Sequence, residues 1–286
     1  MPTLSSETVA ADVWCRLIVA RCGLTFRDAQ IPVVLGIVRE QMQAGGLTSE
    51  RSYYDRLVAA PEGGPEWAAL IGCLLNHETS FFRHQASFDL LRTHILPTLR
   101  EPRGRRLNLW SAGCSTGQEA YSIAMTAMAD EDLRGEFAVW GGDFSRQAIE
   151  VARAGRYGPR AIAGIPPAYR RRFLRTIDVP GGVPEYEIAE SLRQRVRFTT
   201  TNLLASRGVN LSYDVIFCQN VLIYFSPAAV SQVVASLATR LAIGGYLLLG
   251  PGEGPGERPP GLETLTVNGV RAFRRKCHTP SEGRPC

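Results

Sequence analysis

The residues best suited to chemistry lie in and just after a run of small residues at 111–117, SAGCSTG. Gly113 and Gly117 allow the backbone to approach a ligand closely. Helix-forming residues begin at Gln118, and a helix starting there would direct free N–H groups at the ligand. Glu119 in its first turn would repel a pyrophosphate but suit a cationic or hydroxylated ligand. No Lys follows the second glycine and GxGxxG is absent, which excludes the common phosphate and dinucleotide loops.

A second candidate is the acid that ends a predicted parallel strand. Residues 137–143, FAVWGGD, read as that strand, with Asp143 at its carboxyl end, 26 positions past Gly117. In nucleotide-binding α/β folds an acid at this place accepts hydrogen bonds from ribose hydroxyls. From position alone, Asp143 could equally be a turn residue.

Two further segments combine polar and aromatic side chains. Residues 76–84, NHETSFFRH, place two Phe beside Thr79 and Arg83, although the Phe pair could be a hydrophobic plug and Thr79 a helix cap. Residues 213–218, YDVIFC, form the most hydrophobic predicted strand, which we place at the centre of the sheet. Gln219 and Asn220 follow at its carboxyl end, where α/β folds bind ligands, and Tyr224, which could also be a core aromatic, comes next.

Alternating strand and helix patterns position these residues and predict an α/β fold. We expect the parallel strands to be followed by helices, with Ser145 and Ser226 as caps. A last strand near 270–274 is expected to be antiparallel. The predicted strands are 107–110, 137–143, 196–200, 213–218 and 246–249, with helices at 118–128, 147–154 and 226–242.

The N-terminal third lacks strand alternation and reads as helical from residue 3 to about 96. Residues 155–195 interrupt the strand–helix alternation with Gly and Pro, and 186–188 suggest a short antiparallel strand. We therefore divide the chain into a helical domain (1–98), an α/β domain (99–276) with a β insert at about 158–195, and a disordered tail (277–286).

The charge distribution, the hydropathy and the cysteine content limit the partners and the compartment that this chain suits. The net charge is +5, and residues 151–200 carry ten Arg against four acids, so this segment is either a docking surface for an acidic partner or a solvated face. No apolar run approaches the roughly 18–20 residues of a membrane span, and residues 1–14 lack the pattern of a signal peptide. Seven scattered cysteines without CxxC indicate free thiols in a reducing cytoplasm, with Cys114 filling a tight turn.

The chain as a whole resembles the CheR-type chemotaxis receptor methyltransferases from about residue 10 to 275. This resemblance implies a Rossmann-like domain that binds S-adenosylmethionine, preceded by an all-α subdomain and interrupted by a small antiparallel β subdomain. The motifs that carry it are ETSFFR (78–83), WSAGCSTGQEAYSIAM (110–125), GGDFSRQAIEVARAGRY (141–157), NLL (202–204) and FCQNVLIYF (217–225).

The resemblance also implies roles for single residues. Arg83 and Tyr224 are the expected catalytic residues, Asp143 should bind the ribose, and Leu203 should flank the adenine. Three positions depart from the family pattern, because His77 stands where Asn is usual, Gln118 where an acid is usual and Gln219 where Arg is usual. The expected cofactor-binding residues are His77, Thr79, Arg83, Gly113, Glu119, Asp143, Asn202, Leu203, Gln219 and Asn220.

The implied reaction transfers a methyl group from S-adenosylmethionine to glutamate carboxylates of chemoreceptors, giving methyl esters and S-adenosylhomocysteine. The implied partner is the cytoplasmic helical region of those receptors. The protein would be a cytoplasmic monomer that meets the receptors at the membrane. The resemblance implies neither a metal nor a nucleic-acid partner. Two alternatives remain open: methylation of another protein or of a small carboxylate, and a non-catalytic module that binds S-adenosylmethionine. Nucleic-acid methylation fits less well, because QNVL stands where a Pro-Pro-Tyr-type motif would follow the fourth strand.

Overall fold

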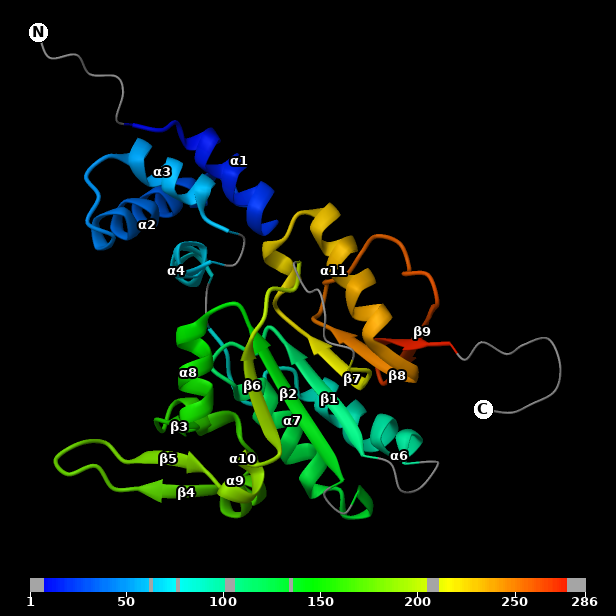
Figure 1. Ribbon diagram of the computed structural model, residues 1–286. Helices are drawn as coiled ribbons and strands as arrows, with labels where there is room; N and C mark the ends of the chain where they lie inside the picture. The colour runs from blue at the N-terminus through cyan, green and yellow to red at the C-terminus, as the bar shows by residue number, and fades with distance from the viewer. Residues whose placement is uncertain are drawn as a thin grey trace, which may run out of the picture.

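The computed structural model describes residues 8–61, 64–75, 78–100, 106–133, 136–204 and 211–276, and its main feature is a seven-stranded sheet (Figure 1). Five neighbouring strands are parallel, and β10 runs antiparallel to both β8 and β9. The predicted central strand is confirmed, since β7 is fourth of seven, and so is the antiparallel last strand. In spatial order the strands are β6 (Val196–Thr200), β2 (Phe137–Asp143), β1 (Leu107–Ala112), β7 (Tyr213–Cys218), β8 (Leu241–Leu249), β10 (Val270–Arg275) and β9 (Leu262–Val267).

Helices cover both faces of this sheet, because its strands alternate side chains between two hydrophobic cores. Leu109 and Phe217 pack on the face covered by α7 (Gln118–Ala129). Trp110 and Ile216, their neighbours in sequence, pack on the face covered by α11 (Pro227–Arg240). The predicted caps are confirmed: the Ser145 and Ser226 hydroxyls accept hydrogen bonds from the first turns of α8 (Arg146–Ala154) and α11.

The boundary predicted between α11 and β8 is wrong. The helix ends at Arg240, and Leu241 already pairs with Tyr213 in the sheet. Gly244 and Gly245 therefore lie inside the strand, in a bulge, and do not end the helix. The bulge brings backbones so close that a Cβ at Gly245 would lie 2.9–3.1 Å from three carbonyl oxygens, which explains the glycine.

The predicted helical N-terminal region is confirmed for the described residues up to Leu99, apart from a single β-bridge at Leu24. Its helices divide between two cores. The first four pack around Trp14, Ile18 and Trp67, whereas those at 85–99 pack against the sheet. The helices are α1 (Ala11–Cys22), α2 (Ile31–Ala44), α3 (Glu50–Ala59), α4 (Pro65–Leu74), and then α5 (Gln85–Leu90), a π-helical turn (Leu91–Ile95) and α6 (Leu96–Leu99).

A second, three-stranded antiparallel sheet projects from the edge near α8, at the lower left of Figure 1. Its central strand contains the predicted strand at 186–188, which is confirmed. None of the described helices is long and apolar enough to cross a membrane. The residues expected to form a disordered tail, 277–286, lie outside the described residues. The small sheet comprises β3 (Arg156–Tyr157), β5 (Glu185–Ile188) and β4 (Leu174–Ile177), accompanied by α9 (Pro167–Phe173) and α10 (Glu190–Arg193).

Candidate active site

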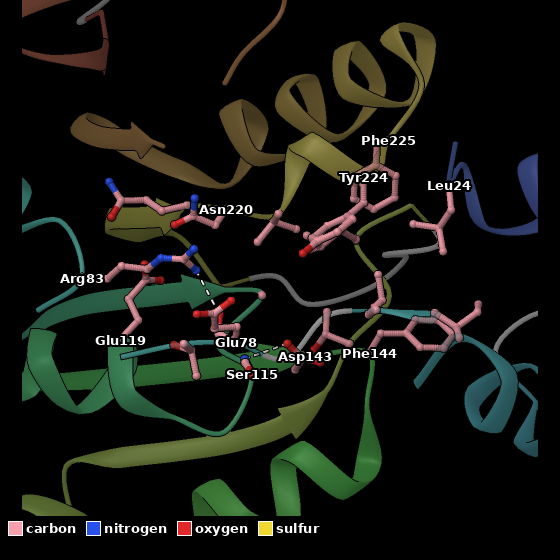
Figure 2. Close-up of a pocket in the computed structure, with 18 of the residues that line it drawn as sticks. Leu24, Glu78, Arg83, Ser115, Glu119, Asp143, Phe144, Asn220, Tyr224 and Phe225 are labelled. Carbon is pink, nitrogen blue, oxygen red and sulfur yellow. Dashed lines mark hydrogen bonds between the residues drawn. The ribbon is translucent and has the colours of Figure 1, made fainter. Parts of the chain in front are cut away.

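A cavity opens at the carboxyl ends of β1, β2 and β7 (Figure 2). Three parts of the chain line it: the strand ends with their loops, the segment at 78–88, and the N-terminal helices through Cys22, Leu24 and Ile71. The structure thus brings the separate predicted segments to one place. His77 lies outside the described residues; the other predicted site residues all line the cavity: Thr79, Arg83, Gly113, Glu119, Asp143, Asn202, Leu203, Gln219, Asn220 and Tyr224.

The loop between β1 and α7 has a shape that only glycine allows at two positions. Gly113 has φ of 87°, and a Cβ there would lie 2.3 Å from Cγ2 of Val221. Gly117 has φ of 97°, and its Cβ would lie 2.8 Å from that of Ala152. Both φ values belong to the left-handed region that other residues adopt with strain. The glycines therefore let the loop pass close to the turn after β7 on one side and to α8 on the other.

Asp143 fixes this loop as well as facing the cavity. Its side chain is 8% exposed, and its two oxygens accept hydrogen bonds from the backbone N–H groups of Ser115, at 2.7 Å, and Ser145, at 2.9 Å. The predicted role as a ribose-binding acid and the alternative role as a turn residue are therefore compatible. The carboxylate is oriented by the turn and still borders the cavity.

Glu119 is an acid whose surroundings favour its neutral form. Its carboxyl group borders the cavity, and protein surrounds it elsewhere; this burial raises its pKa to about 8, with a smaller contribution from the negative charge of Glu253. A hydrogen bond from the Ser111 hydroxyl, at 2.7 Å, and the positive charge of Arg83 act in the opposite direction. A cationic ligand group placed here would draw Glu119 into its ionised form.

Arg83 and Tyr224 lie on the side of the cavity opposite Asp143 (Figure 2). The Arg83 guanidinium donates to the carbonyl oxygen of Glu78 at 3.0 Å, and its charge acts on both Glu119 and Tyr224. Burial raises the pKa of the Tyr224 hydroxyl, which therefore remains a proton donor at neutral pH. The cavity is thus lined by a cation, Arg83, and a neutral hydrogen-bond donor, Tyr224. The acids Glu119 and Asp143 line the same cavity.

The structure also shows which way the predicted amides face. The Gln219 side-chain nitrogen donates to the Ser87 hydroxyl, at 2.9 Å, and to the Leu249 carbonyl, so it is engaged within the protein. The Asn202 side-chain oxygen accepts from the Leu204 N–H at 3.0 Å, forming a local turn. Each of these two side chains therefore uses one of its polar groups within the protein while it lines the cavity.

Sequence reasoning missed Glu253, which is only 4% exposed. Its carboxylate accepts hydrogen bonds from the backbone N–H groups of Asn220, at 2.7 Å, Gly250, at 2.9 Å, and Ile223, at 3.2 Å. Asn220 has φ of 59°, and its side-chain oxygen contacts Nε2 of His84 at 2.7 Å. The only sequence signal was an acid in a Gly- and Pro-rich loop, a common surface pattern.

The donor set fits a ligand that carries both positive charge and ribose hydroxyls. The acids Glu119 and Asp143 suit a cation and a diol, and apolar side chains such as Phe144 and Leu203 offer a surface for a base. S-adenosylmethionine combines these features. Among the described residues, no group of three His, Cys, Asp or Glu side chains is placed to bind a metal ion.

The fold and the site define a class. The sheet has the 3-2-1-4-5-6 strand order of Rossmann-like domains with one antiparallel strand, β10, inserted beside the last. With a glycine loop after β1 and an acid at the end of β2, this is a Rossmann-like S-adenosylmethionine-dependent methyltransferase. The family model described as CheR methyltransferase, SAM binding domain, matches residues 77–260. The chain belongs to the CheR methyltransferase family.

Curated relatives span most of the chain. A probable chemotaxis protein methyltransferase of Rhizobium etli is 31% identical over 245 residues, covering 83% of this chain and 89% of the relative. The chemotaxis protein methyltransferase Cher2 of Pseudomonas putida is 31% identical, covering 81% and 85%. The probable biofilm formation methyltransferase WspC of Pseudomonas aeruginosa is 34% identical over 94% of this chain, which spans 63% of that relative.

Proposed function

We propose that this methyltransferase transfers the methyl group of S-adenosylmethionine to glutamate side chains in the cytoplasmic helical region of chemoreceptors. The products are glutamate methyl esters and S-adenosylhomocysteine. The names of the relatives from Rhizobium etli and Pseudomonas putida support an acceptor in a chemotaxis pathway. The observation that carries the proposal is the cavity itself, which Arg83, Tyr224, Glu119 and Asp143 line together.

The proposed roles follow from the charges around the cavity. When bound, S-adenosylmethionine supplies an electrophilic methyl group on a sulfonium. Asp143 and Glu119 would bind the hydroxyls and the cationic end of the donor, with Gly113 giving the backbone close approach. Arg83 would pair with the incoming carboxylate, and the protonated Tyr224 hydroxyl would donate a hydrogen bond to it.

No general base is required for this reaction. A glutamate carboxylate has a pKa near ~4.3 and is already a nucleophile at pH 7. Rate acceleration would come from alignment of the two reactants and from exclusion of water. Leu24, Ile71 and Phe225 are among the apolar lining residues and would contribute to that exclusion.

The test is transfer of labelled methyl from S-adenosylmethionine to membranes that contain the chemoreceptors of the same organism. We expect base-labile label on a receptor band, lost with Asp143→Asn and lost when the candidate acceptor glutamates are replaced by Ala. S-adenosylhomocysteine binding, measured by calorimetry, separates a wrong acceptor from a defective enzyme. Binding without transfer to any receptor would refute the proposed acceptor.

A second acceptor class follows from one comparison. The biofilm relative from Pseudomonas aeruginosa is the more identical of the three and matches 94% of this chain. A protein that takes part in biofilm formation is therefore the alternative acceptor. Label on such a protein, with none on chemotaxis receptors in the same membranes, would favour it.

A further inference from the structure

A tyrosine of the small sheet reaches into the glycine loop of the cofactor site. Tyr157, the second residue of β3, is 5% exposed, and its hydroxyl donates to the carbonyl oxygen of Thr116 at 2.8 Å. Burial raises the pKa of this hydroxyl well above 10, so it stays a donor. Gly117 leaves room for this hydroxyl, because a Cβ at position 117 would lie 3.1 Å from the hydroxyl oxygen. The loop conformation next to Ser115 therefore depends on Tyr157.

The same ring also contacts the segment that carries Arg83. Tyr157 and Phe81 meet edge to face, with ring centroids 5.0 Å apart. Phe81 is buried and lies two residues before Arg83. The backbone of the insert packs on it too, since a Cβ at Gly164 would lie 2.5 Å from the Phe81 carbonyl oxygen. One side chain thus touches both the glycine loop and the segment that presents Arg83.

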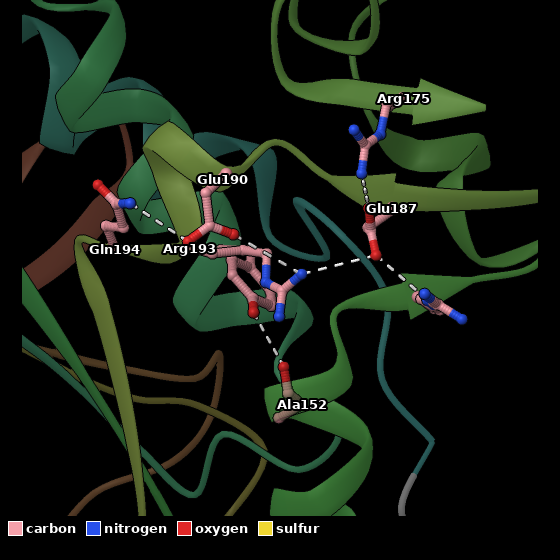
Figure 3. Close-up of polar contacts among 8 residues, drawn as sticks. Ala152, Arg175, Glu187, Glu190, Arg193 and Gln194 are labelled. Atoms are coloured by element: carbon pink, nitrogen blue, oxygen red, sulfur yellow. Dashed lines mark hydrogen bonds and ion pairs between the residues drawn. The ribbon is translucent and has the colours of Figure 1, made fainter. Parts of the chain in front are cut away.

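Ion pairs brace the small sheet behind Tyr157. Figure 3 shows Glu187 of β5 between Arg175 of β4 and Arg193 of α10, and Arg156 of β3 donates to the same carboxylate at 3.2 Å. Hydrogen bonds from Arg175 and Arg156 lower the pKa of Glu187. Because Arg156 precedes Tyr157 directly, a displacement of the small sheet would move the tyrosine with it.

We propose that Tyr157 is a positioning residue through which the inserted sheet sets the shape of both walls of the cofactor cavity. It acts through the Thr116 carbonyl and the Phe81 ring, without lining the cavity itself. The insert is then a structural part of the cofactor site as well as a protruding surface. This inference depends on binding of S-adenosylmethionine or its product and not on which acceptor is methylated.

The experiment compares Tyr157→Phe with Tyr186→Phe, a tyrosine that pairs with Tyr157 in the same sheet. Tyr157→Phe keeps the ring on Phe81 but leaves the Thr116 carbonyl without its donor. We expect its affinity for S-adenosylhomocysteine, measured by calorimetry, to fall roughly tenfold. Hydrogen exchange should accelerate in a peptide covering 113–118. The control should match the wild-type protein in both measurements.

Tyr157→Leu extends the test to the second contact. It removes the edge-to-face ring pair, so exchange should accelerate at 78–84 as well as at 113–118. A merely structural role would lower the melting temperature and accelerate exchange across the whole domain without preference for 78–84 or 113–118, yet leave the dissociation constant of the folded fraction unchanged. That result, or equal effects of Tyr157→Phe and Tyr186→Phe, would overturn the proposal.

Discussion

Glu119 makes binding of the methyl donor depend on pH. Its pKa of about 8 means that most of it is neutral at pH 7 and ionised at pH 9. Because the ionised form attracts a cationic ligand, the ratio of wild-type to Glu119→Gln affinity for S-adenosylmethionine should rise about tenfold over this range. Titration calorimetry at several pH values measures the ratio, and taking a ratio cancels the ligand's own titration.

Glu119 should also make the stability of the unliganded protein depend on pH. This stability should fall as pH rises, whereas the affinity for the methyl donor should increase. Its folded pKa lies above the unfolded value, so the folded state retains a proton that the unfolded state has lost. The unliganded wild-type protein should therefore lose stability relative to Glu119→Gln as pH rises from about 4.3 to about 8. Thermal melts of both proteins test this. An affinity ratio and a melting difference that are both flat with pH would show that Glu119 is already ionised.

Tyr224→Phe tests the proposed acceptor side of the site. Removing the hydroxyl deletes a donor aimed at a charged carboxylate, worth about 1.5–3 kcal/mol. We expect kcat to fall roughly 10- to 100-fold while affinity for S-adenosylhomocysteine stays close to that of the wild type. Methyl-transfer rates and calorimetry on the same preparations provide the two values. Equal losses in both would identify Tyr224 as a packing residue, in keeping with its contacts to the N-terminal core.

The predicted residues illustrate what a single sequence can reveal about a site. The places of Gly113 and Asp143 in the cavity lining were predictable, because both residues lie at predicted strand ends. Glu253 was not, because it acts on backbone N–H groups 30 and 33 residues away, which any residue types could supply. The inward orientation of Gln219 was also hidden, since it depends on Ser87 from a distant helix.

At the scale of elements, Glu253 fixes the turn between β7 and α11. Glu253→Gln keeps the size of the side chain but replaces one acceptor oxygen with a donor group that faces backbone N–H groups. We expect a loss of about 1–3 kcal/mol in the free energy of unfolding. Because the turn carries Tyr224, methyl transfer should slow beyond what the loss of folded protein explains.

Glu257→Gln is the matched control for this prediction, because Glu257 is an exposed acid on the same loop. Chemical denaturation and methyl-transfer rates should leave the control unchanged. Glu253→Gln should in addition lower the pKa of Glu119, since it removes a negative charge that raises it. A variant as stable and active as the control would show that the turn holds its shape without the carboxylate.

Element types were more predictable than element partners. A hydrophobic run located β7, and caps located α8 and α11, because these signals are local. The start of β8 was misplaced because Leu241 pairs with Tyr213, a contact that no local pattern encodes. The packing of residues 85–99 on the sheet was likewise invisible, since a helical period shows an apolar face but not what covers it.

At the scale of the whole molecule, the N-terminal helices close one end of the cavity through a short stretch after α1. Thr25 N–H donates to the Tyr224 carbonyl at 2.8 Å, and Ser226 N–H donates to the Gly23 carbonyl at 2.9 Å. Leu24 forms an isolated bridge with Phe225 between these two bonds. The helical part and the sheet therefore share one wall, and loosening their contact should weaken ligand binding.

Gly23 offers a clean test of this contact. It has φ of 67°, and a Cβ there would lie 2.7 Å from Leu204 and 2.9 Å from Ala229, so Gly23→Ala should displace the helices from the start of α11. Gly46→Ala is the matched control, since Gly46 has φ of 73° with open space around it and carries the same backbone strain of about 1–2 kcal/mol without the collision. We expect both variants to melt at lower temperature, Gly23→Ala the lower of the two.

Only Gly23→Ala should bind S-adenosylhomocysteine more weakly, by roughly tenfold, because only it disturbs the wall formed by Cys22 and Leu24. Unchanged binding in Gly23→Ala would mean that the sheet alone supplies the affinity and that the helices serve another step, such as acceptor docking.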